Sequence, residues 1–484
     1  MGGAIRDYLK KTLVVSRKSL VVKTKDYDFV VRKNAQGLAK AFTQKIKGRL
    51  IELDEERKIY RVIVRRDNTN YQFDFANFQG KTIEEDLSQR DFTINAMAIK
   101  ISNFPRHSGE SRNPVSLGVW TPAFAGVTKE LRNLDLIDPC QGIQDLRAKK
   151  IRAISERSFK EDPLRLLRAF RFHATLGFTI EPKTLRWIAK YSAFIRRPAP
   201  ERIRAELMEM LRAPSAYPSL KLMDQTRLLT KIFPVLEKSR NLARGYYKRG
   251  GVLGHSLDSV DRFEDAMKGW KKRWPKIGGL IEKYLFEEIS GSYPRYITLK
   301  LATLAHDIAK PHTAKIIKGR MRFFGHDEKG AKLFAKIGGR LRFSRDEIDL
   351  VCKIIKAHLR PGNLSEQPTV TDRAIYRFFR DLGEDGVAVL LVALADHQSY
   401  MKPGARWAKS EKSVHVIRFM LEKYFLEAEK VVPPKLITGH DVMRTLGITP
   451  SPKVGEILEK IQSLQAEGKI KTKTQALAHL QKLK

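Results

Sequence analysis

Alternating apolar and polar positions predict a small sheet near the start of the chain. Over residues 71–77, Tyr71, Phe73 and Phe75 alternate with polar residues, and Asp74 lies between the last two rings. Successive side chains of a strand point to opposite faces, so the rings should be buried and Asp74 should lie on the other face. Similar patterns predict strands over 49–54 and 59–66 and a helix over 35–46. Together these elements predict an α+β palm.

A pair of carboxylates opens a further apolar run just upstream. Asp26 and Asp28 flank Tyr27 and lead into Phe29. In a strand both carboxylates share one face, where like charges disfavour each other's ionised forms unless a cation lies between them. One interpretation is a divalent metal site with Asp74 as a third carboxylate, and the other is a solvated strand end.

A second group of metal-binding residue types lies further along the chain. One apolar helical run ends at His306-Asp307, and another ends at Asp396. Imidazole and carboxylate groups bind first-row divalent ions, which activate water against phosphoesters. The candidate ligands are His255, His306, Asp307 and Asp396. His326 and His358 fall between them, and the alternative is that these histidines are hydrogen-bonded core residues.

The charge of the chain indicates a polyanionic partner. The 484 residues are enough for roughly three domains. Lys and Arg number 92 against 54 acidic residues, which gives a net charge of +38. Such an excess favours nucleic acid or an anionic membrane, and no apolar run approaches the roughly 20 residues that span a bilayer. We therefore expect nucleic acid and no membrane.

Cysteine usage indicates a reducing compartment. Cys140 and Cys352 lie far apart and form no metal-ligand pair, so we expect neither a disulfide nor a zinc site. No signal-peptide pattern precedes Gly2. These features predict a cytoplasmic protein.

Several ordered motifs then resemble a known family. The first three are Gly-Gly-x-x-Arg-Asp at 2–7, Asp-x-Asp at 26–28 and Arg-Asp-Phe-Thr-Ile-Asn-Ala-Met-Ala at 90–98. In this order they resemble the head of a class II tRNA nucleotidyltransferase or bacterial poly(A) polymerase. The segments 136–146, 161–165 and 201–207 continue the resemblance. It implies an α+β, polymerase-β-like nucleotidyltransferase palm followed by a mostly α-helical neck, HD domain and tail.

The resemblance also implies a two-metal reaction in the head. Asp26 and Asp28 would hold two Mg²⁺ ions, with Asp74 as third ligand, for attack of an RNA 3′-hydroxyl on a nucleoside triphosphate. Residues implied to contact the nucleotide are Gly2, Gly3, Arg6, Arg90, Asp91 and Asn95. The expected reaction adds CMP and AMP, from CTP and ATP, as CCA at the 3′ end of tRNA.

Other activities of the chain remain open from the sequence. Within the family they are addition of A alone, addition of CC alone, and poly(A) tailing. A different class is a catalytically impaired RNA-binding protein whose only activity is in the HD domain.

The predicted neck carries the residues implied to recognise the base. Glu161, Arg165 and Arg168 are spaced to align on one helix face. By resemblance, Asp162 and Arg165 pair with the base edge, Glu161 holds Arg165 in place, and Arg168 joins the nucleotide-binding set. A carboxylate accepts from an exocyclic amine and a guanidinium offers forked donors, which suits this role. The helix over 201–207 is expected to brace the neck.

The second half of the chain resembles the HD phosphohydrolases. The order His255, His306-Asp307, Asp396 matches their ligand pattern, and Lys310 is placed to touch a phosphate. The resemblance implies a divalent transition metal and a phosphodiesterase or phosphatase activity. Residues 436–484 resemble a small helical RNA-binding module. His440-Asp441 repeats the letters of the motif but lacks partners, so we assign it no metal.

Three departures from the family pattern accompany these motifs. The apolar strand that precedes the Gly-Gly pair in the family would lie ahead of Met1, which implies either an upstream start or an impaired copy. Residues 12–23 and 106–128 are insertions, and the second resembles translated palindromic repeat elements of bacterial genomes. The expected domains are 1–132, 133–240, 245–405 and 406–484.

Overall fold

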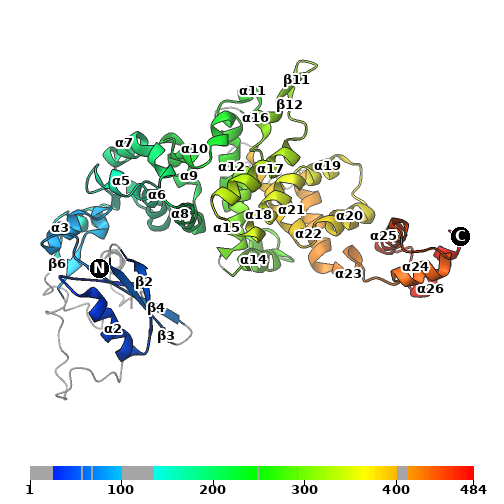
Figure 1. Cartoon of the computed structure of the whole chain (residues 1–484). Helices are drawn as coiled ribbons and strands as arrows, with labels where there is room; N and C mark the ends of the chain where they lie inside the picture. The colour runs from blue at the N-terminus through cyan, green and yellow to red at the C-terminus, as the bar shows by residue number, and fades with distance from the viewer. Residues whose placement is uncertain are drawn as a thin grey trace. The chain divides into compact units, whose positions relative to one another are not determined.

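The computed structural model of the chain forms two compact units (Figure 1). It describes residues 26–55, 58–66, 69–100, 136–247, 250–291, 293–400 and 412–483. The first unit comprises Met1–Pro198 with Gln225–Leu228, and the second comprises Ala199–Asp224 with Leu229–Lys484. The boundary at Pro198 falls inside the predicted neck, and the division into four domains stays a prediction.

A four-stranded sheet forms the palm of the first unit. Its strands are β1 (Asp26–Val31), β2 (Arg49–Asp54), β3 (Ile59–Arg66) and β4 (Thr69–Asn77), and α2 (Ala35–Ile46) follows β1. The order is β1-β4-β3-β2, with β1 parallel to β4 and the other pairs antiparallel. The predicted strands and helix are confirmed.

Aromatic alternation decides which face of this sheet is covered. Phe73 and Phe75 are buried, and the rings of Tyr27 and Phe29 stack on them at centroid distances of 5.2 and 5.0 Å. Phe42 of α2 meets Phe73 edge-on at 5.0 Å, so the helix closes this core. The polar residues between the rings therefore lie on the opposite face.

Short elements complete the first unit. They are α3 (Ile83–Ser88), η1 (Thr93–Asn95), β5 (Ala98–Ile99), β6 (Leu136–Ile137), α4 (Gly142–Arg147), β7 (Lys150–Ile151), α5 (Ser158–Glu161), α6 (Arg165–Leu176), β8 (Thr179–Ile180), α7 (Pro182–Tyr191) and η4 (Ser192–Arg196). β5 pairs with β6, and β7 pairs with β8. The inserted residues 12–23 and 106–128 lie outside the described part of the chain.

Helices dominate the second unit. They begin with α8 (Pro200–Arg212), α9 (Tyr217–Gln225), α10 (Leu228–Ile232), η5 (Pro234–Ser239), α11 (Arg244–Tyr247), α12 (Gly251–Met267), α13 (Trp270–Arg273) and α14 (Gly278–Phe286). A small β9–β10 pair (Glu288–Ile289, Tyr293–Pro294) leads to α15 (Arg295–Ala305) and α16 (Lys310–Thr313). The hairpin β11–β12 (Lys315–Ile317, Arg320–Arg322) precedes α17 (His326–Arg340), α18 (Arg345–Ala357), α19 (Arg360–Glu366), α20 (Asp372–Leu382), α21 (Asp385–Ser399), α22 (Lys412–Leu426) and α23 (Ala428–Val431).

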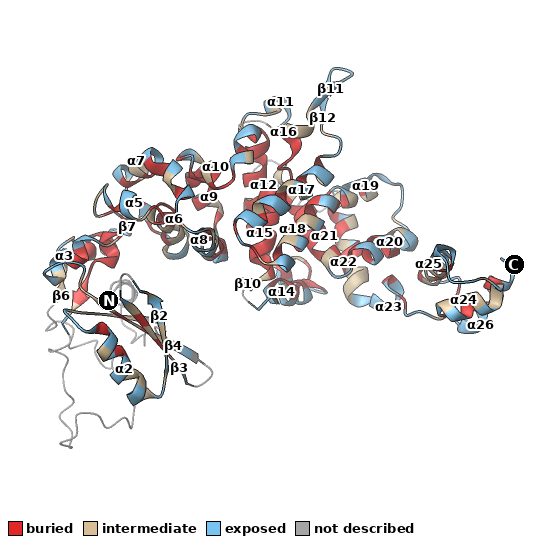
Figure 2. Cartoon of the chain, in the orientation of Figure 1, coloured by how far each residue is buried: buried red, intermediate tan, exposed pale blue. Residues whose placement is uncertain are grey.

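The core of the second unit lies among α12, α15, α18 and α21. Every residue of α15 is buried, as are residues 386–395 of α21, and Figure 2 shows α12 and α15 largely as buried helices. The predicted buried helices before His306 and Asp396 are therefore confirmed. α8 lies in this unit, where Arg204 pairs with Glu347 at 2.7 Å, and its expected role in bracing the neck stays a prediction.

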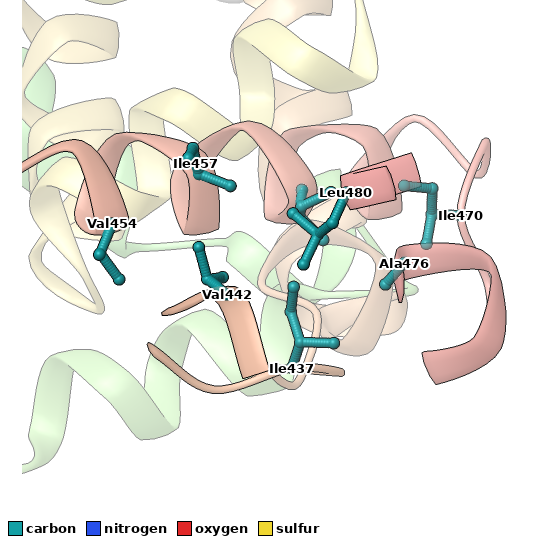
Figure 3. Packing of buried hydrophobic residues seen from close by; sticks show 8 residues of the cluster. Ile437, Val442, Val454, Ile457, Ile470, Ala476 and Leu480 are labelled. Carbon is teal, nitrogen blue, oxygen red and sulfur yellow. The ribbon is translucent and has the colours of Figure 1, made fainter. Parts of the chain in front are cut away.

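The chain ends in three helices with a core of their own. They are α24 (Gly439–Leu446), α25 (Pro452–Ala466) and α26 (Lys473–Gln481). Aliphatic side chains pack between them, including Ile437, Val442 and Leu480 (Figure 3). Asp441 is part of the capping box of α24, where it accepts from the backbone N–H of Thr438 at 2.9 Å. This structural role accounts for the aspartate of the second His-Asp pair.

No helix in the described part of the chain is long and apolar enough to cross a membrane.

Candidate functional site

The face of the head sheet opposite the aromatic core carries the predicted carboxylates. In the parallel β1–β4 pair Asp28 lies directly across from Asp74, and Asp26 lies across from Gln72. Residues paired in register point to the same face, so Asp28 and Asp74 share it. The side chain of Asp26 lies outside the described residues, as do Gly2, Gly3 and Arg6.

An arginine already engages one of these carboxylates. Arg61 of β3, the register partner of Asp74, donates from Nε and Nη2 to its two carboxylate oxygens, each at 2.7 Å. This bidentate pair holds Asp74 in a fixed orientation and neutralises part of its charge. A cation on this face would share Asp74 with Arg61 or displace it.

Asp91 is the centre of a buried polar group beneath α6. It accepts from the backbone N–H of Phe92 at 2.8 Å, from Asn95 Nδ2 at 2.9 Å and from Arg168 Nε at 2.8 Å. Burial alone would raise the pKa of Asp91, but Arg168 and the hydrogen bond from Asn95 hold it below its usual value. Asp91 and Asn95 thus tie the 90–95 segment to α6.

Arg90 and Arg165, both predicted to contact the nucleotide, differ in how many of their hydrogen-bond donors are engaged by the protein. Arg90 pairs with Asp86 at 2.7 Å. Arg165 has no ion-pair partner among the described residues, and its one hydrogen bond there runs 3.4 Å from Nη1 to the carbonyl oxygen of Arg90. Burial lowers the pKa of Arg165, against the opposing effects of Asp91 and Asp162. A half-buried guanidinium with donors to spare is equipped to bind a polar ligand.

The predicted alignment of Glu161 and Arg165 on one helix face is wrong, whereas the support of Arg165 by Glu161 stays a prediction. α5 ends at Glu161 and α6 begins at Arg165, so the two residues do not align on one helix. Pro163 lies between them, and its ring and missing N–H prevent one continuous helix. Glu161 instead accepts from Arg157 Nε at 2.7 Å. Asp162 remains at the break, where it accepts from the backbone N–H of Leu164 at 3.2 Å.

The second unit gathers four histidines around two aspartates. His255 comes from α12 and Asp396 from α21, while His306 and Asp307 follow α15 directly. His326 begins α17, and His358 follows α18. Five of these six side chains are buried, and Asp396 is half-buried. Five helices of the second unit thus converge on one point.

The distances divide this cluster into two groups that share Asp307. His255 Nε2 lies 3.0 Å from Asp396 Oδ1 and 3.5 Å from Asp307 Oδ2. His306 Nε2 lies 3.3 Å from Asp307 Oδ2 and 3.5 Å from Asp396 Oδ1. The Nε2 atoms of His326 and His358 lie 3.4 and 3.7 Å from Asp307 Oδ1. One oxygen of Asp307 therefore faces each group.

Backbone contacts orient the histidine rings for ligation. The Nδ1 atoms of His306, His326 and His358 each lie 2.7 Å from a carbonyl oxygen three residues upstream, and Nδ1 of His255 lies 2.9 Å from Ser399 Oγ. A carbonyl only accepts, so these three Nδ1 atoms carry a proton and each ring directs its Nε2 at the centre. Such outer contacts are typical of metal-binding histidines.

The cluster also attracts positive charge. Within the described residues, His255 Nε2, His306 Nε2, Asp307 Oδ1 and Asp396 Oδ1 are buried, and although they lie 3.0–3.7 Å from other atoms of the cluster they make no hydrogen bond of good geometry. Burial alone would lower the pKa of His306, but Asp307 and Asp396 together raise it to about 10. Buried nitrogen and carboxylate donors without partners are the donor set of a divalent metal, so the residues fit such a group.

His326 and His358 are two further candidate ligands, which the sequence analysis did not assign. Both were noted between the predicted ligands, and a signal was present: His358 follows an apolar helix and an alanine, as His306 does. Lys310, predicted to touch a phosphate, ion-pairs with Asp307 and donates to Tyr247 Oη at 2.5 Å. It therefore supports the cluster directly.

Comparison with known proteins places these sites in a family. Family models match for the poly A polymerase head domain at residues 1–107, a probable RNA and SrmB-binding site of polymerase A at 177–239 and the HD domain at 284–401. The A-adding tRNA nucleotidyltransferase of Deinococcus radiodurans is 30% identical and aligns over 100% of this chain and 94% of its own length. The CC-adding tRNA nucleotidyltransferase of Synechocystis is 28% identical over 100% and 92%.

A solved structure agrees in fold. The Thermotoga maritima CCA-adding enzyme, determined with tRNA, matches at a TM-score of 0.60 and 21% identity over 99% of this chain and 89% of its own. Head, RNA-binding and HD segments thus follow one another along this chain, which belongs to the tRNA nucleotidyltransferase and poly(A) polymerase family.

Proposed function

We propose that this chain transfers CMP and AMP from CTP and ATP to the 3′ end of tRNA in the cytoplasm. The observation that carries the proposal is the register of Asp28 and Asp74 on the open face of the head sheet. Relatives that match the whole chain are named for the same class of reaction. The +38 net charge suits a polynucleotide substrate.

Asp28 and Asp74, together with Asp26, would hold Mg²⁺ in the head. When bound, Mg²⁺ supplies a lower pKa for the attacking 3′-hydroxyl and charge stabilisation for the departing pyrophosphate. Arg61 fixes the direction in which Asp74 presents its oxygens. The positions of the carboxylates would thereby limit where the attacking 3′-hydroxyl oxygen and the oxygen of the departing pyrophosphate can lie.

Arg165 and Asp162 would recognise the base of the incoming nucleotide. Arg165 has spare donors and reaches the carbonyl of Arg90, so it lies against the 90–95 segment. Asp91, through Arg168 and Asn95, holds that segment and α6 at a fixed separation. Arg90, Asp91 and Asn95 remain proposed contacts of the nucleotide's sugar and phosphates.

A separate observation supports the addition of A alone. Relatives of 26–30% identity that match this chain over 91–94% of their own length are named A-adding or CC-adding, whereas a CCA-adding enzyme solved with ATP matches over 91% of its own length at 21% identity. The multifunctional CCA protein of Cupriavidus metallidurans matches over 60% of this chain and 58% of its own length. This supports a specialised A-adding enzyme as the second candidate function.

The HD cluster would carry a second activity, the hydrolysis of phosphoesters. We propose that it binds two divalent transition metal ions, one at His255, His306 and Asp396 and one at His326 and His358, with Asp307 between them. Bound metal would supply an activated water. Lys310 would hold Asp307 in the bridging orientation.

The experiment for the head uses tRNA transcripts that end before, within and after CCA. Each is incubated with Mg²⁺ and with CTP, ATP or both, and product lengths are determined. Asp28→Asn should lower the rate at least tenfold, because a lost metal ligand raises the barrier by more than about 1.4 kcal/mol. Glu55→Gln, an exposed acid in the β2–β3 turn, is the control.

The products separate the alternatives. Growth by A only on transcripts ending in CC establishes the A-adding reaction, and growth by three nucleotides on transcripts lacking CCA establishes full addition. Binding of tRNA without extension of any transcript would contradict the proposal and leave a catalytically inactive RNA-binding protein.

Metal content tests the HD centre separately. The protein is saturated with Mn²⁺, passed through a desalting column and analysed by elemental mass spectrometry. His358→Ala should retain about one ion fewer than the wild type in this unit, and hydrolysis of a chromogenic phosphoester should fall with it. Equal metal content in both proteins would contradict the two-ion assignment.

A further inference from the structure

An exposed hairpin joins two parts of the HD cluster. β11 begins five residues after Lys310, and β12 ends four residues before His326. Lys318 and Gly319 both have positive φ, at 48° and 70°, which suits the two-residue turn of a tight hairpin. Figure 1 shows the hairpin extending away from α16 and α17. All six strand residues are exposed.

The hairpin has one basic face and one apolar face. Its register pairs Lys315 with Arg322 and Ile317 with Arg320, so these four side chains share a face. Ile316 and Met321 pair on the other face and are 75% and 40% exposed. No acidic residue occurs between Lys310 and Gly325 in the sequence.

The basic face lacks the counter-charges that would stabilise it. Lys315, Arg320 and Arg322 have no ion-pair partner in the part of the chain that the structure describes. Like charges directly opposite each other destabilise a strand pair, and an isolated two-stranded hairpin is only marginally stable in water. Such a face would be stabilised by a bound anion.

The spacing and the neighbouring residues indicate an extended polyanion with bases. Arg320 and Arg322 are alternate residues of β12 and lie about 7 Å apart, and Lys315 lies directly across from Arg322, so the three cations suit two successive phosphates of one chain better than one small anion. Phe324, at 74% exposure, offers a flat aromatic surface two residues after Arg322, whereas Ile316 and Met321 form the apolar surface of the opposite face. Cations interleaved with exposed aromatic groups are typical of single-stranded nucleic acid sites.

The base of the hairpin is connected to the metal cluster. Phe323 follows β12, and its carbonyl oxygen lies 2.7 Å from His326 Nδ1. The Phe323 ring lies 6.5 Å from the ring of Tyr247 and 5.5 Å from Lys310 Nζ, and Tyr247 packs on the ring of His255 at 4.9 Å. A strand held on the hairpin would thus lie beside the residues that orient His326 and Asp307.

We propose that the β11–β12 hairpin is an RNA-binding arm of the HD centre, which holds a single-stranded RNA segment beside the metal cluster. The assignment to RNA rests on the proposed tRNA substrate, whereas the arm itself does not depend on transfer by the head. Lys315, Arg320 and Arg322 bind phosphates, and Phe324 stacks on a base.

Binding of a fluorescent single-stranded RNA of about 12 nucleotides tests the charge of the arm. The triple variant Lys315→Ala, Arg320→Ala and Arg322→Ala is compared with the control triple Lys272→Ala, Lys332→Ala and Lys336→Ala, which removes equal charge from exposed helical positions of the same unit. The salt dependence of log affinity should become shallower by about 2 in the arm variant, since each phosphate contact contributes about 0.7. Equal slopes in the two triples would overturn the proposal.

A photo-crosslink locates the RNA. p-Benzoyl-phenylalanine is placed at Phe324 of the arm or at Phe286, a 59% exposed phenylalanine at the end of α14. Position 324 should crosslink to the RNA at least fivefold more than position 286, and the arm triple should abolish that difference. Crosslinking of a polyglutamate chain but not of RNA at position 324 would overturn the proposal. These readouts are independent of nucleotide transfer, so failure of the arm and failure of the head reaction are distinguishable.

Discussion

At the scale of single residues, some charged side chains of the first unit are fully hydrogen-bonded within the protein, and others keep donors that a ligand could use. Asp91 accepts three hydrogen bonds and Asp74 is held by Arg61, so both are fixed before any ligand arrives. Arg165 makes one long hydrogen bond to a carbonyl among the described residues. Asp91 and Asp74 are therefore oriented in advance by the protein, whereas Arg165 keeps most of its donors for a ligand.

Arg165→Ala should relax the choice among nucleotides more than it weakens tRNA binding, because the forked donor contacts a base edge while other basic residues bind phosphates. The discrimination between ATP and CTP in kcat/KM should fall by about tenfold or more, corresponding to roughly 1–3 kcal/mol for one base contact. Arg165→Lys, which keeps the charge without the fork, should behave like Arg165→Ala. A collapse of tRNA affinity with intact discrimination would identify Arg165 as a backbone contact.

Asp91 should make stability depend on pH. Because its folded pKa is lowered, the ionised carboxylate stabilises the fold above its ordinary pKa of about 3.9, and this contribution is lost as the pH falls through the folded value. Asp91→Asn should therefore unfold more easily than the wild type at pH 7, by about 1–3 kcal/mol, with the difference shrinking below about pH 4. Urea unfolding at several pH values measures this. Glu84→Gln, on exposed α3, is the control and should show no such convergence.

At the scale of elements, short connections set where the functional residues lie. The break at Pro163 separates α5 from α6, so Glu161 and Arg165 belong to different helices. α4 begins at Gly142, whose backbone N–H donates to Asp138 at 2.7 Å and which lies against the 93–95 turn. These contacts hold η1, and with it Asn95, in position.

Gly142→Ala should destabilise the head. A Cβ at this position would lie 2.3 Å from the carbonyl oxygen of Thr93, a backbone atom that cannot rotate away. The expected cost is about 1–3 kcal/mol, measured as a lower unfolding midpoint. In contrast, Gly339→Ala in α17 meets nothing within 4 Å and should stabilise its helix by about 0.5–1 kcal/mol. Similar midpoints for the two variants would contradict this packing.

Deletion of residues 106–128 should leave transfer activity and melting temperature nearly unchanged. The flanking strands β5 and β6 pair with each other, Ala98 opposite Ile137, so the connection closes on a formed strand pair. Each doubling of a loop's length costs only about 0.6 kcal/mol. Loss of folding, or a change in which tRNA is accepted, would show that the segment packs on the head or contacts substrate.

At the scale of the whole molecule, the two candidate centres lie in different compact units. The carboxylates of the head belong to the first unit and the histidine cluster belongs to the second. Each centre is built from residues of its own unit, and each unit has its own buried core. The two chemistries should therefore be separable by mutation.

His306→Ala should abolish metal retention by the HD cluster while leaving nucleotide transfer within about twofold of the wild type. Asp28→Asn should do the opposite, because the ligands of the two centres are not shared. Elemental analysis after Mn²⁺ loading and the tRNA extension assay are run on both variants. Loss of both activities in either variant, with an unchanged circular dichroism spectrum, would show that the units are coupled.

The sequence by itself determined the elements of the palm and the residue types of both centres. Strands 49–54 and 59–66 and helix 35–46 follow from periodicity alone, since alternation and helical spacing are local properties of the chain. The aromatic residues at 73 and 75 fix which face is buried, and hence that Asp28 and Asp74 share the other. The local hydrophobic pattern was sufficient to predict the palm because this sheet buries only one of its two faces.

Only the tertiary structure decided which distant groups meet. The pairing of Asp74 with Arg61 and of Asp91 with Arg168 depends on strand register and on how α6 packs, which periodicity does not encode. His326 and His358 join the cluster because α17 and α18 bring their ends to Asp307, although 19 and 51 positions separate them from it in the sequence. Contacts across such separations are selected by packing of whole helices, and the local sequence carries little record of them.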